Sequence, residues 1–383
     1  MKKITAIILA VVMLCGCAAG CGSSEEDTVM TVNGYEVSFD EYMAWLASAV
    51  SEIKQIYSGY SEVDWDGSFI YDGSITNAEW CIKRANENVI KIHAVESRAS
   101  ELGVTVTDEQ KQDIEDELKD LRDTYATGDD PDASMKAFLA SYNYTEASYK
   151  EQRRLNYLYY NLFTELYGEE GEKLDEEKVL KFAEENDYVT SAHILIKTTE
   201  DVTDEDGKTS SKELSEAAKA EKLAKAQELA DELKAISDDS KRRERFKELM
   251  DEYSEDPGRE SFPNGYCFTK GTMVEVYDTT SRSLEEYQVS DPVESEHGYH
   301  VIMRLPTTGA DLVSYYSSYQ QMIVPLSYLA APGYYDTDIA GWVKDAKVKY
   351  TSLYENTDFT KFITDDGFNY VCYADYKADK DKK

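Results

Sequence analysis

Prolines are distributed unevenly along this 383-residue chain: Pro131 is the only proline before residue 257, and six follow from Pro257 onward. Because proline breaks helix interiors, the first two thirds of the chain can form long helices. Apolar residues there recur at steps of three and four, the pattern of amphipathic helices. We therefore predict helices, several opened by capping boxes, from Ser38 past Ile56, from Thr76 to about Gly103, from Thr107 to about Gly128, over 145–167 and over 175–185.

The first 16 residues resemble a bacterial lipoprotein signal peptide and are not expected to belong to the fold. Their apolar run, Ile4–Leu14, follows two lysines and is too short to span a bilayer. It ends in a sequence that resembles a lipobox, which implies lipidation at Cys17 and a place on the outer face of the bacterial cell membrane. Cys21 is a poorer alternative, and an ordinary secretory peptide is another interpretation. Residues 17–29 are expected to form an acidic tether.

Acidic residues outnumber basic ones by 76 to 41, a formal net charge of -35 at pH 7. Affinity for nucleic acid comes from clustered cations, so we expect no nucleic-acid partner. The same charge disfavours electrostatic attachment to anionic lipid. The cysteines beyond Cys17 are too scattered for a disulfide framework, and no Cys/His spacing fits a metal site. We therefore predict no metal and no cofactor.

The character of the sequence changes near residue 188. Tyr188–Lys197 is the first long alternating, β-branched run and predicts a strand. Two charged helices are predicted over about 213–236 and 240–253, and Gly298–Leu305 predicts a second strand. These elements predict a compact α+β domain. The expected domain order is a helical domain over 30–186, an inserted α+β domain over 187–306, and a C-terminal segment over 307–383.

The C-terminal segment has no nucleotide-binding or hydrolase pattern. We predict an aromatic-rich helix over Tyr315–Leu329 and a short helix over Asp338–Ala346. A lone helix that exposed Trp342 would be unstable. We therefore expect this segment to pack back on the helical domain.

Three of the four histidines lie in the α+β segment, with His193 on its first strand and His300 on its last. If the two strands are neighbours in the sheet, these side chains can lie side by side. Such a pair needs an explanation, because neither a metal-ligand spacing nor a Ser or Cys nucleophile accompanies it. His93 lies on a predicted helix with no partner apparent nearby in the sequence, and we interpret it as structural.

Four segments resemble, in the same order, the motifs of parvulin peptidyl-prolyl isomerases. They are Ser191–Ile196 on the first strand, Phe246–Asp256 in a helix and turn, Phe268–Val274 in a pocket segment, and Val289–Ile302 in the closing stretch. Together with the lipobox and the helical domain, they resemble the PrsA/SurA-type extracytoplasmic foldases. The resemblance implies an α+β parvulin-like domain, a small antiparallel sheet with flanking helices, inserted in an all-helical chaperone-like domain.

The resemblance also implies roles for single residues. The catalytic residues would be His193, Asp256, His300 and Ser295. The two histidines would form a hydrogen-bonded floor, and the acid would place negative charge near the amide. The substrate-binding residues, around an apolar proline pocket, would be Met273, Tyr277, Phe268 and Tyr266.

The function implied by the resemblance is peptidyl-prolyl cis–trans isomerisation that assists the folding of secreted proteins. Expected partners are unfolded polypeptides with X-Pro bonds, the membrane through the lipid anchor, and a second copy of the chain in a homodimer. Phe262–Cys267 departs from the family's glycine-rich segment, and Tyr277 replaces its usual Phe. An alternative therefore stays open: a catalytically weak or inactive parvulin scaffold that acts as a holdase chaperone. Acids follow Lys197 where phosphate-selecting parvulins are basic, so phosphate selection is not expected.

Overall fold

The computed structural model describes residues 26–58, 62–141, 145–203, 207, 209–317, 320–364 and 367–382. The predicted signal peptide, the predicted lipidation residue Cys17 and its alternative Cys21 lie outside these residues. The chain divides into two compact units: the described residues within Met1–Glu165 and Tyr334–Lys383, and those within Leu166–Gly333. None of the helices in the described part of the chain combines the length and the apolar character needed to cross a membrane.

Both divisions between the units fall inside helices, α5 (Glu146–Tyr167) and α10 (Leu326–Asp345). The sequence-based boundaries at 186/187 and 306/307 lie instead in the connections after α6 (Glu176–Glu185) and after β10 (Gly298–Leu305). We keep those boundaries as a proposal about the extent of the domains, and describe each compact unit by itself.

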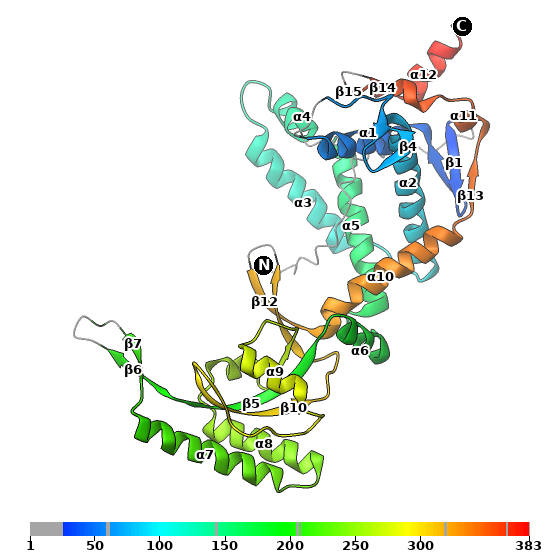
Figure 1. Cartoon of the computed structure of the whole chain (residues 1–383). Helices are drawn as coiled ribbons and strands as arrows, with labels where there is room; N and C mark the ends of the chain where they lie inside the picture. Colours follow the sequence, from blue (N-terminus) through cyan, green and yellow to red (C-terminus); the bar gives the residue numbers. More distant parts are fainter. Residues whose placement is uncertain are drawn as a thin grey trace. The chain divides into compact units, whose positions relative to one another are not determined.

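The first unit is mainly helical and includes the later part of the C-terminal segment, from Tyr334 on, whereas residues 307–333 belong to the second unit (Figure 1). Its three-stranded sheet has the order β13-β1-β2, so the late strand β13 (Val348–Tyr350) pairs antiparallel with the first strand of the chain. Its other strands are β1 (Thr28–Val32), β2 (Tyr35–Ser38), β3 (Ser68–Phe69), β4 (Asp72–Thr76), β14 (Ile363–Thr364) and β15 (Gly367–Phe368). Its other helices are α1 (Phe39–Ile56), α2 (Asn77–Glu101), α3 (Asp108–Tyr125), α4 (Pro131–Ser141), α11 (Ser352–Glu355), η2 (Phe359–Phe362) and α12 (Tyr373–Lys380).

Local sequence signals set the ends of these elements. Asn33 and Gly34 both have positive φ, 53° and 92°, and form the two-residue turn between β1 and β2. The capping box predicted for α2 is confirmed: Thr76 accepts the backbone N–H of Glu79, and the Glu79 side chain reciprocates. At the start of α1, Ser38 accepts the N–H of Glu41, which is one half of the capping box predicted there. Thr107 forms a capping box at the start of α3 as well. α4 was not predicted, although Pro131 occupies its first position, where proline is favoured.

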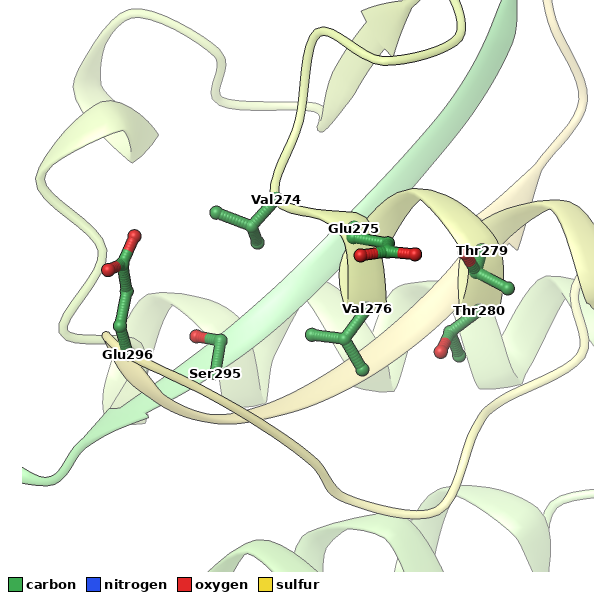
Figure 2. Close-up of a pocket in the computed structure, with 7 residues that line it drawn as sticks. All are labelled: Val274, Glu275, Val276, Thr279, Thr280, Ser295 and Glu296. Carbon is green, nitrogen blue, oxygen red and sulfur yellow. The ribbon is translucent and has the colours of Figure 1, made fainter.

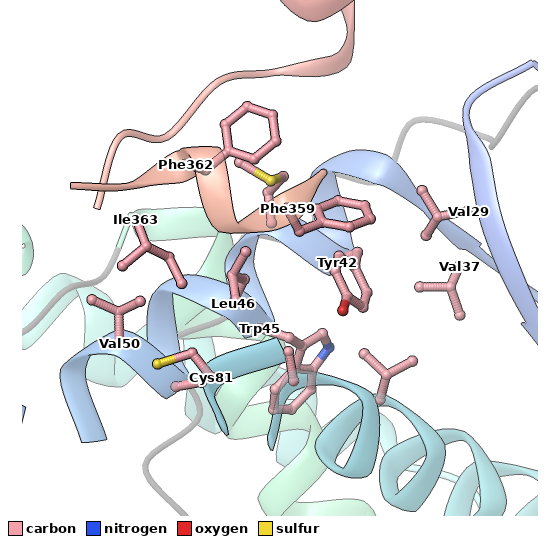
Figure 3. Close-up of a cluster of buried hydrophobic side chains, with 14 of the residues drawn as sticks. Val29, Val37, Tyr42, Trp45, Leu46, Val50, Cys81, Phe359, Phe362 and Ile363 are labelled. Atoms are coloured by element: carbon pink, nitrogen blue, oxygen red, sulfur yellow. The ribbon is translucent and has the colours of Figure 1, made fainter. Parts of the chain in front are cut away.

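The core of the first unit forms where α1 and α2 meet the C-terminal segment. Trp45 and Leu46 on α1 are buried together with Cys81 on α2 (Figure 3). Phe359 lies with its ring centroid 4.6 Å from that of Tyr42. Residues more than three hundred positions apart therefore share one hydrophobic core.

The second unit is built on a six-stranded sheet with the order β12-β11-β8-β5-β10-β9. β5 (Val189–Lys197) and β10 are antiparallel neighbours at its centre, as their motifs predicted. The flanking strands are β8 (Tyr266–Phe268), β9 (Val293–Ser295), β11 (Leu312–Ser317) and β12 (Gln320–Pro325). A separate hairpin joins β6 (Thr199–Thr203) to β7 (Thr209–Glu213).

Helices α7 (Glu216–Lys234) and α8 (Asp239–Tyr253) form the main core of this unit with one face of the sheet. Ala192, Ile194 and Ile196, which alternate along β5, all belong to this core. Because side chains alternate between the faces of a strand, the residues between them point to the opposite face, where α9 (Glu275–Ser283) packs. The α+β fold class is confirmed.

One predicted element is wrong. Tyr315–Leu329 was expected to be a helix, but Leu312–Ser317 and Gln320–Pro325 form the β11–β12 hairpin, and α10 begins only at Leu326. Val313 pairs with Cys267 in β8, so the hairpin extends the central sheet. β-Branched and aromatic residues of this kind are enriched in strands. Here that preference agrees with the structure, whereas the helix-like spacing of the apolar residues does not. The second predicted helix, Asp338–Ala346, is the end of α10.

His93 is buried and lies between two carboxylates. Its Nε2 is 2.9 Å from Glu41 on α1, and its Nδ1 is 3.0 Å from Glu96 on its own helix. The expectation of no nearby partner was wrong, since Glu96 is three residues away on the same helical face. Arg154 on α5 pairs with Glu96, and the Tyr35 ring stacks on the imidazole. Burial lowers the pKa of His93, but the two carboxylates outweigh it and raise the pKa to about 10.

We predict that His93→Gln reduces a pH-dependent part of the stability of the first unit. The unfolded histidine has a pKa of about 6.5, so the stabilisation is complete below that pH and disappears as the pH rises through about 10. The gap in unfolding free energy between wild type and His93→Gln should therefore be widest near pH 6 and shrink toward pH 10. All four tryptophans lie in the first unit, so their fluorescence during urea unfolding measures this gap. His297→Gln, at an exposed histidine, is the control; a gap for His93→Gln that does not change with pH would contradict the assignment.

Candidate functional site

The register of the central strands places the two predicted histidines on one face of the sheet. His193 pairs with Ile302, and His300 pairs with Leu195, so the histidines are diagonal neighbours across the antiparallel pair. Their rings stack with centroids 5.0 Å apart and an interplanar angle of 11°. This is the face opposite the core of α7 and α8, and α9 packs over it.

A chain of hydrogen bonds runs through this pair. Nδ1 of His193 lies 2.8 Å from Nδ1 of His300, and Nε2 of His193 lies 2.9 Å from Oδ2 of Asp256. Tyr266 donates its hydroxyl to the same carboxylate oxygen at 2.6 Å. At the other end, Ser295 Oγ lies 2.6 Å from Nε2 of His300. The structure thus brings together five side chains from separate strands and turns.

Asp256 is both a turn residue and a member of this chain. Its Oδ1 accepts the backbone N–H of Gly258 at the start of η1 (Pro257–Glu260). Its Oδ2 faces His193 and Tyr266. The turn therefore fixes the carboxylate and leaves one oxygen for the histidine.

The chemistry of the groups limits which of them can donate. An ionised Asp256 only accepts, so Nε2 of His193 carries a hydrogen. When His193 is neutral, its Nδ1 accepts from His300, whose Nε2 then accepts from the Ser295 hydroxyl. A proton added to His193 reverses both bonds, because His300 must then accept at Nδ1 and donate at Nε2. Both rings cannot be cationic, because a bond between two Nδ1 atoms needs one lone pair.

The electrostatics of the site hold a carboxylate beside neutral groups. Burial raises the pKa of Asp256, but hydrogen bonds from His193 and Tyr266 outweigh it and keep that pKa below its ordinary value. Burial raises the pKa of Tyr266, and the bond to Asp256 raises it further. Burial, together with the charges of His193 and His297, lowers the pKa of His300 to about 3. Near neutral pH the site therefore contains an anionic Asp256 and an uncharged His300.

The predicted pocket side chains lie next to the histidines but differ in exposure. Tyr277 is only 3% exposed, its ring is edge-on to His193 at 5.0 Å, and its hydroxyl lies 2.8 Å from Ser191 Oγ. Phe268 is 4% exposed and packs against Tyr277, with ring centroids 5.7 Å apart. Met273 is half-buried in the same apolar cluster. The structure therefore places Tyr277 and Phe268 as the buried wall and Met273 at the accessible edge.

Tyr266 has a second role that the sequence did not indicate. It lies next to Gly265, whose φ is +108° and where an added Cβ would lie 2.6 Å from the carbonyl oxygen of Ser191. No side chain fits at that position. Tyr266 is half-buried and packs against Phe262, with the two rings tilted and their centroids 4.7 Å apart, while its hydroxyl donates a hydrogen bond to Asp256. The aromatic spacing was visible in the sequence, but the hydroxyl contact depends on the fold.

A groove of about 520 Å³ adjoins this network (Figure 2). Ser295 is one of its lining residues and the only one that the sequence had singled out. The others are Val274, Glu275, Val276, Thr279, Thr280 and Glu296. Within the described residues, no cluster of three or more His, Cys, Asp or Glu side chains is arranged to hold a metal ion.

Comparison with known protein families agrees with this geometry. Residues 193–305 match the family described as the PPIC-type PPIase domain. The chain carries a PPIC-type PPIase domain. This domain contains the two histidines, Asp256 and the whole groove. Residues 1–162 match the family described as the SurA-like N-terminal domain.

Curated relatives include foldases. The foldase protein PrsA of Halalkalibacterium halodurans is 28% identical over 254 residues, which are 64% of this chain and 65% of the relative. The foldase protein PrsA of a Geobacillus species is 40% identical over 83 residues, 21% of this chain and 28% of the relative. The chain thus spans less than two thirds of the length of these relatives. The crystal structure of PrsA from Bacillus subtilis matches at 18% identity and a TM-score of 0.24, over 74% of this chain and 92% of that chain.

We predict that Tyr266→Phe raises the pKa of Asp256, because it removes one of the hydrogen bonds that lower it. The stabilisation from an acid with a depressed pKa is present above its unfolded pKa and is lost as the pH falls through its folded pKa. At pH 7 the loss of a bond to a charged group should lower the unfolding free energy by about 1.5–3 kcal/mol. Carboxyl ¹³C NMR measures the first effect and urea unfolding the second.

Tyr316→Phe is the matched control for this prediction, because that side chain on β11 is 71% exposed. Tyr316→Phe should leave both the pKa of Asp256 and the unfolding free energy unchanged. An unaltered titration of Asp256 in Tyr266→Phe would contradict the hydrogen-bond chain described above.

Proposed function

We propose that the chain is a peptidyl-prolyl cis–trans isomerase that assists the folding of secreted polypeptides. The observation that carries the proposal is the hydrogen-bonded pair of His193 and His300, flanked by Asp256 and Ser295 and bordered by an apolar wall, within a PPIC-type PPIase domain. The foldase relatives support the same activity.

Isomerisation of an X-Pro bond breaks no covalent bond. The barrier, about 20 kcal/mol, arises from the partial double bond of the amide and makes the uncatalysed reaction take tens of seconds. A catalyst must stabilise the twisted amide more than the planar one. Twisting returns electron density from the carbonyl oxygen to the nitrogen, so surroundings that disfavour a negative carbonyl oxygen lower the barrier.

The site has the parts for this task. Met273 and Tyr277 would hold the apolar proline ring and exclude water from the amide. Asp256 stays anionic, and negative charge near the carbonyl oxygen would destabilise the planar form. His193, His300 and Ser295 would keep the carboxylate and the floor of the site in place.

The proposal also includes where the protein acts, what it acts on and whether it forms a homodimer. The lipobox-like sequence supports lipidation at Cys17 and attachment at the outer face of the cell membrane. The match of residues 1–162 to the SurA-like N-terminal domain supports unfolded polypeptides as clients of the first unit. A homodimer is retained as part of this proposal.

The isomerase proposal predicts turnover that depends on the hydrogen-bond chain. Exchange NMR on a short X-Pro peptide should show catalysis by the full chain. His300→Ala and Asp256→Ala should each lower kcat/KM by about tenfold or more, which is about 1.4 kcal/mol of transition-state stabilisation. Tyr316→Ala, at a side chain on β11 that is 71% exposed, should keep the wild-type rate.

Two results would count against the proposal in different ways. Exchange no faster than in the peptide alone would rule out isomerase activity. Exchange that is catalysed but insensitive to both His300→Ala and Asp256→Ala would rule out the assigned site.

A holdase chaperone is the second candidate, and the backbone at Gly265 favours it. An added Cβ at Gly265 would lie 2.6 Å from the carbonyl oxygen of Ser191, so this position cannot carry an aliphatic side chain like the one that the resemblance implies for the glycine-rich segment. Suppression of client aggregation by the full-length His300→Ala variant distinguishes the candidates. Full suppression together with wild-type turnover no faster than background would support the holdase.

A further inference from the structure

The groove beside the hydrogen-bond chain lies between two segments of the second unit. Figure 2 shows Val274 and the first turns of α9 on one side, with Ser295 and Glu296 on the other. Val276, Thr279 and Thr280 continue the α9 side. The lining therefore combines short apolar and hydroxyl side chains with a carboxylate from each side.

This groove is continuous with the proposed isomerase site. Ser295 lines the groove and also bonds to His300. Val274 follows Met273 in the sequence and packs in the same apolar cluster. A polypeptide whose proline lies against Met273 and Tyr277 would therefore place a neighbouring residue in the groove.

The two carboxylates of the groove are not neutralised within the described residues. Glu275 has no ion-pair partner there, and Glu296 is 77% exposed with only a 3.8 Å contact to His297. None of the described residues that line the groove is a Lys or Arg. Lys and Arg side chains combine an aliphatic stem with a cationic end, which fits apolar walls beneath a carboxylate rim.

We propose that this groove binds a Lys or Arg side chain next to the proline, so that the site prefers cationic X-Pro segments. The inference rests on the proposed isomerase function and specifies its substrate class. The two carboxylates act on the client as specificity determinants, whereas Asp256 is already bonded to Tyr266 and His193. Acidic or phosphorylated flanking residues are repelled from the same groove.

The test compares three peptides that differ only in the residue before proline: Lys, Gln or Glu. Exchange NMR with the full chain measures kcat/KM for each. We expect kcat/KM for the Lys peptide to exceed kcat/KM for the Glu peptide by only about tenfold at low salt. The difference is modest because each exposed charge pair contributes little free energy by itself. The ratio should fall as salt screens the charges.

Two variants examine the carboxylates directly. Glu275→Gln with Glu296→Gln should bring the Lys-to-Glu ratio close to one. The matched control, Glu285→Gln with Glu286→Gln, removes the same charge from exposed positions just beyond α9 and should keep the wild-type ratio. Thr280→Arg places a cation in the groove and should favour the Glu peptide. Circular dichroism confirms that each variant is folded.

The outcomes separate the inference from the function it rests on. An unchanged ratio in the groove double variant, or an equal loss in the control, would overturn the groove assignment while turnover persists. If the wild type turns over no peptide, the isomerase proposal fails. An NMR titration with the same peptides then decides the groove: shifts of the Val274 and Val276 methyls that favour Lys support it, and equal shifts for Lys and Glu overturn it.

Discussion

Eight consecutive residue pairs join β5 to β10, from Thr190 with Leu305 to Lys197 with Gly298, and most of the second unit depends on this register. It turns Ile194 toward the core of α7 and α8 and His193 toward the opposite face. A slip of one residue would exchange the two faces and put the imidazole into the hydrophobic core. Gly298 helps to fix the register, because its φ is +136° and a side chain there would overlap the carbonyl oxygen of Ile196.

The hydrogen-bond chain that this register creates has a limited set of proton positions. The bond between the two Nδ1 atoms allows at most one cationic ring, and Asp256 requires a hydrogen on the facing nitrogen of His193. Burial keeps His300 uncharged near neutral pH. Isomerisation transfers no proton, so in the proposed function these bonds would act by fixing geometry and charge. In low-dielectric surroundings such a satisfied network also resists distortion.

Sequence patterns predicted the parts of the structure that depend on local chemistry. The capping box at Thr76, the helix start at Thr107, the two central strands and the adjacency of His193 and His300 could all be predicted. The resemblance to the parvulin motifs predicted that Asp256 and Ser295 lie next to that pair.

The rest depends on contacts between distant segments. The spacing of apolar residues over β11 and β12 predicts a helix, but the two strands pair with each other as a hairpin, and the pairing of Val313 with Cys267 joins this hairpin to the central sheet. Of the two carboxylates beside His93, Glu96 could have been predicted, because it lies three residues further along the same helix. Glu41 could not, because it lies on another helix. The contact of the Tyr266 hydroxyl with Asp256 requires the turn that Gly265 allows. The groove needs α9 and the turn after β9 together.

The acidic residues of this chain differ in whether other groups of the fold neutralise their charge. Glu41 and Glu96 enclose His93, and Asp256 accepts hydrogen bonds from two side chains, so their charge is used within the fold. The groove carboxylates have no such compensation from the residues that line the groove. A charge that the fold does not neutralise can be neutralised by a ligand. The net charge of -35 therefore bears on function through single sites, because screening confines each exposed charge to a range of about 8–10 Å.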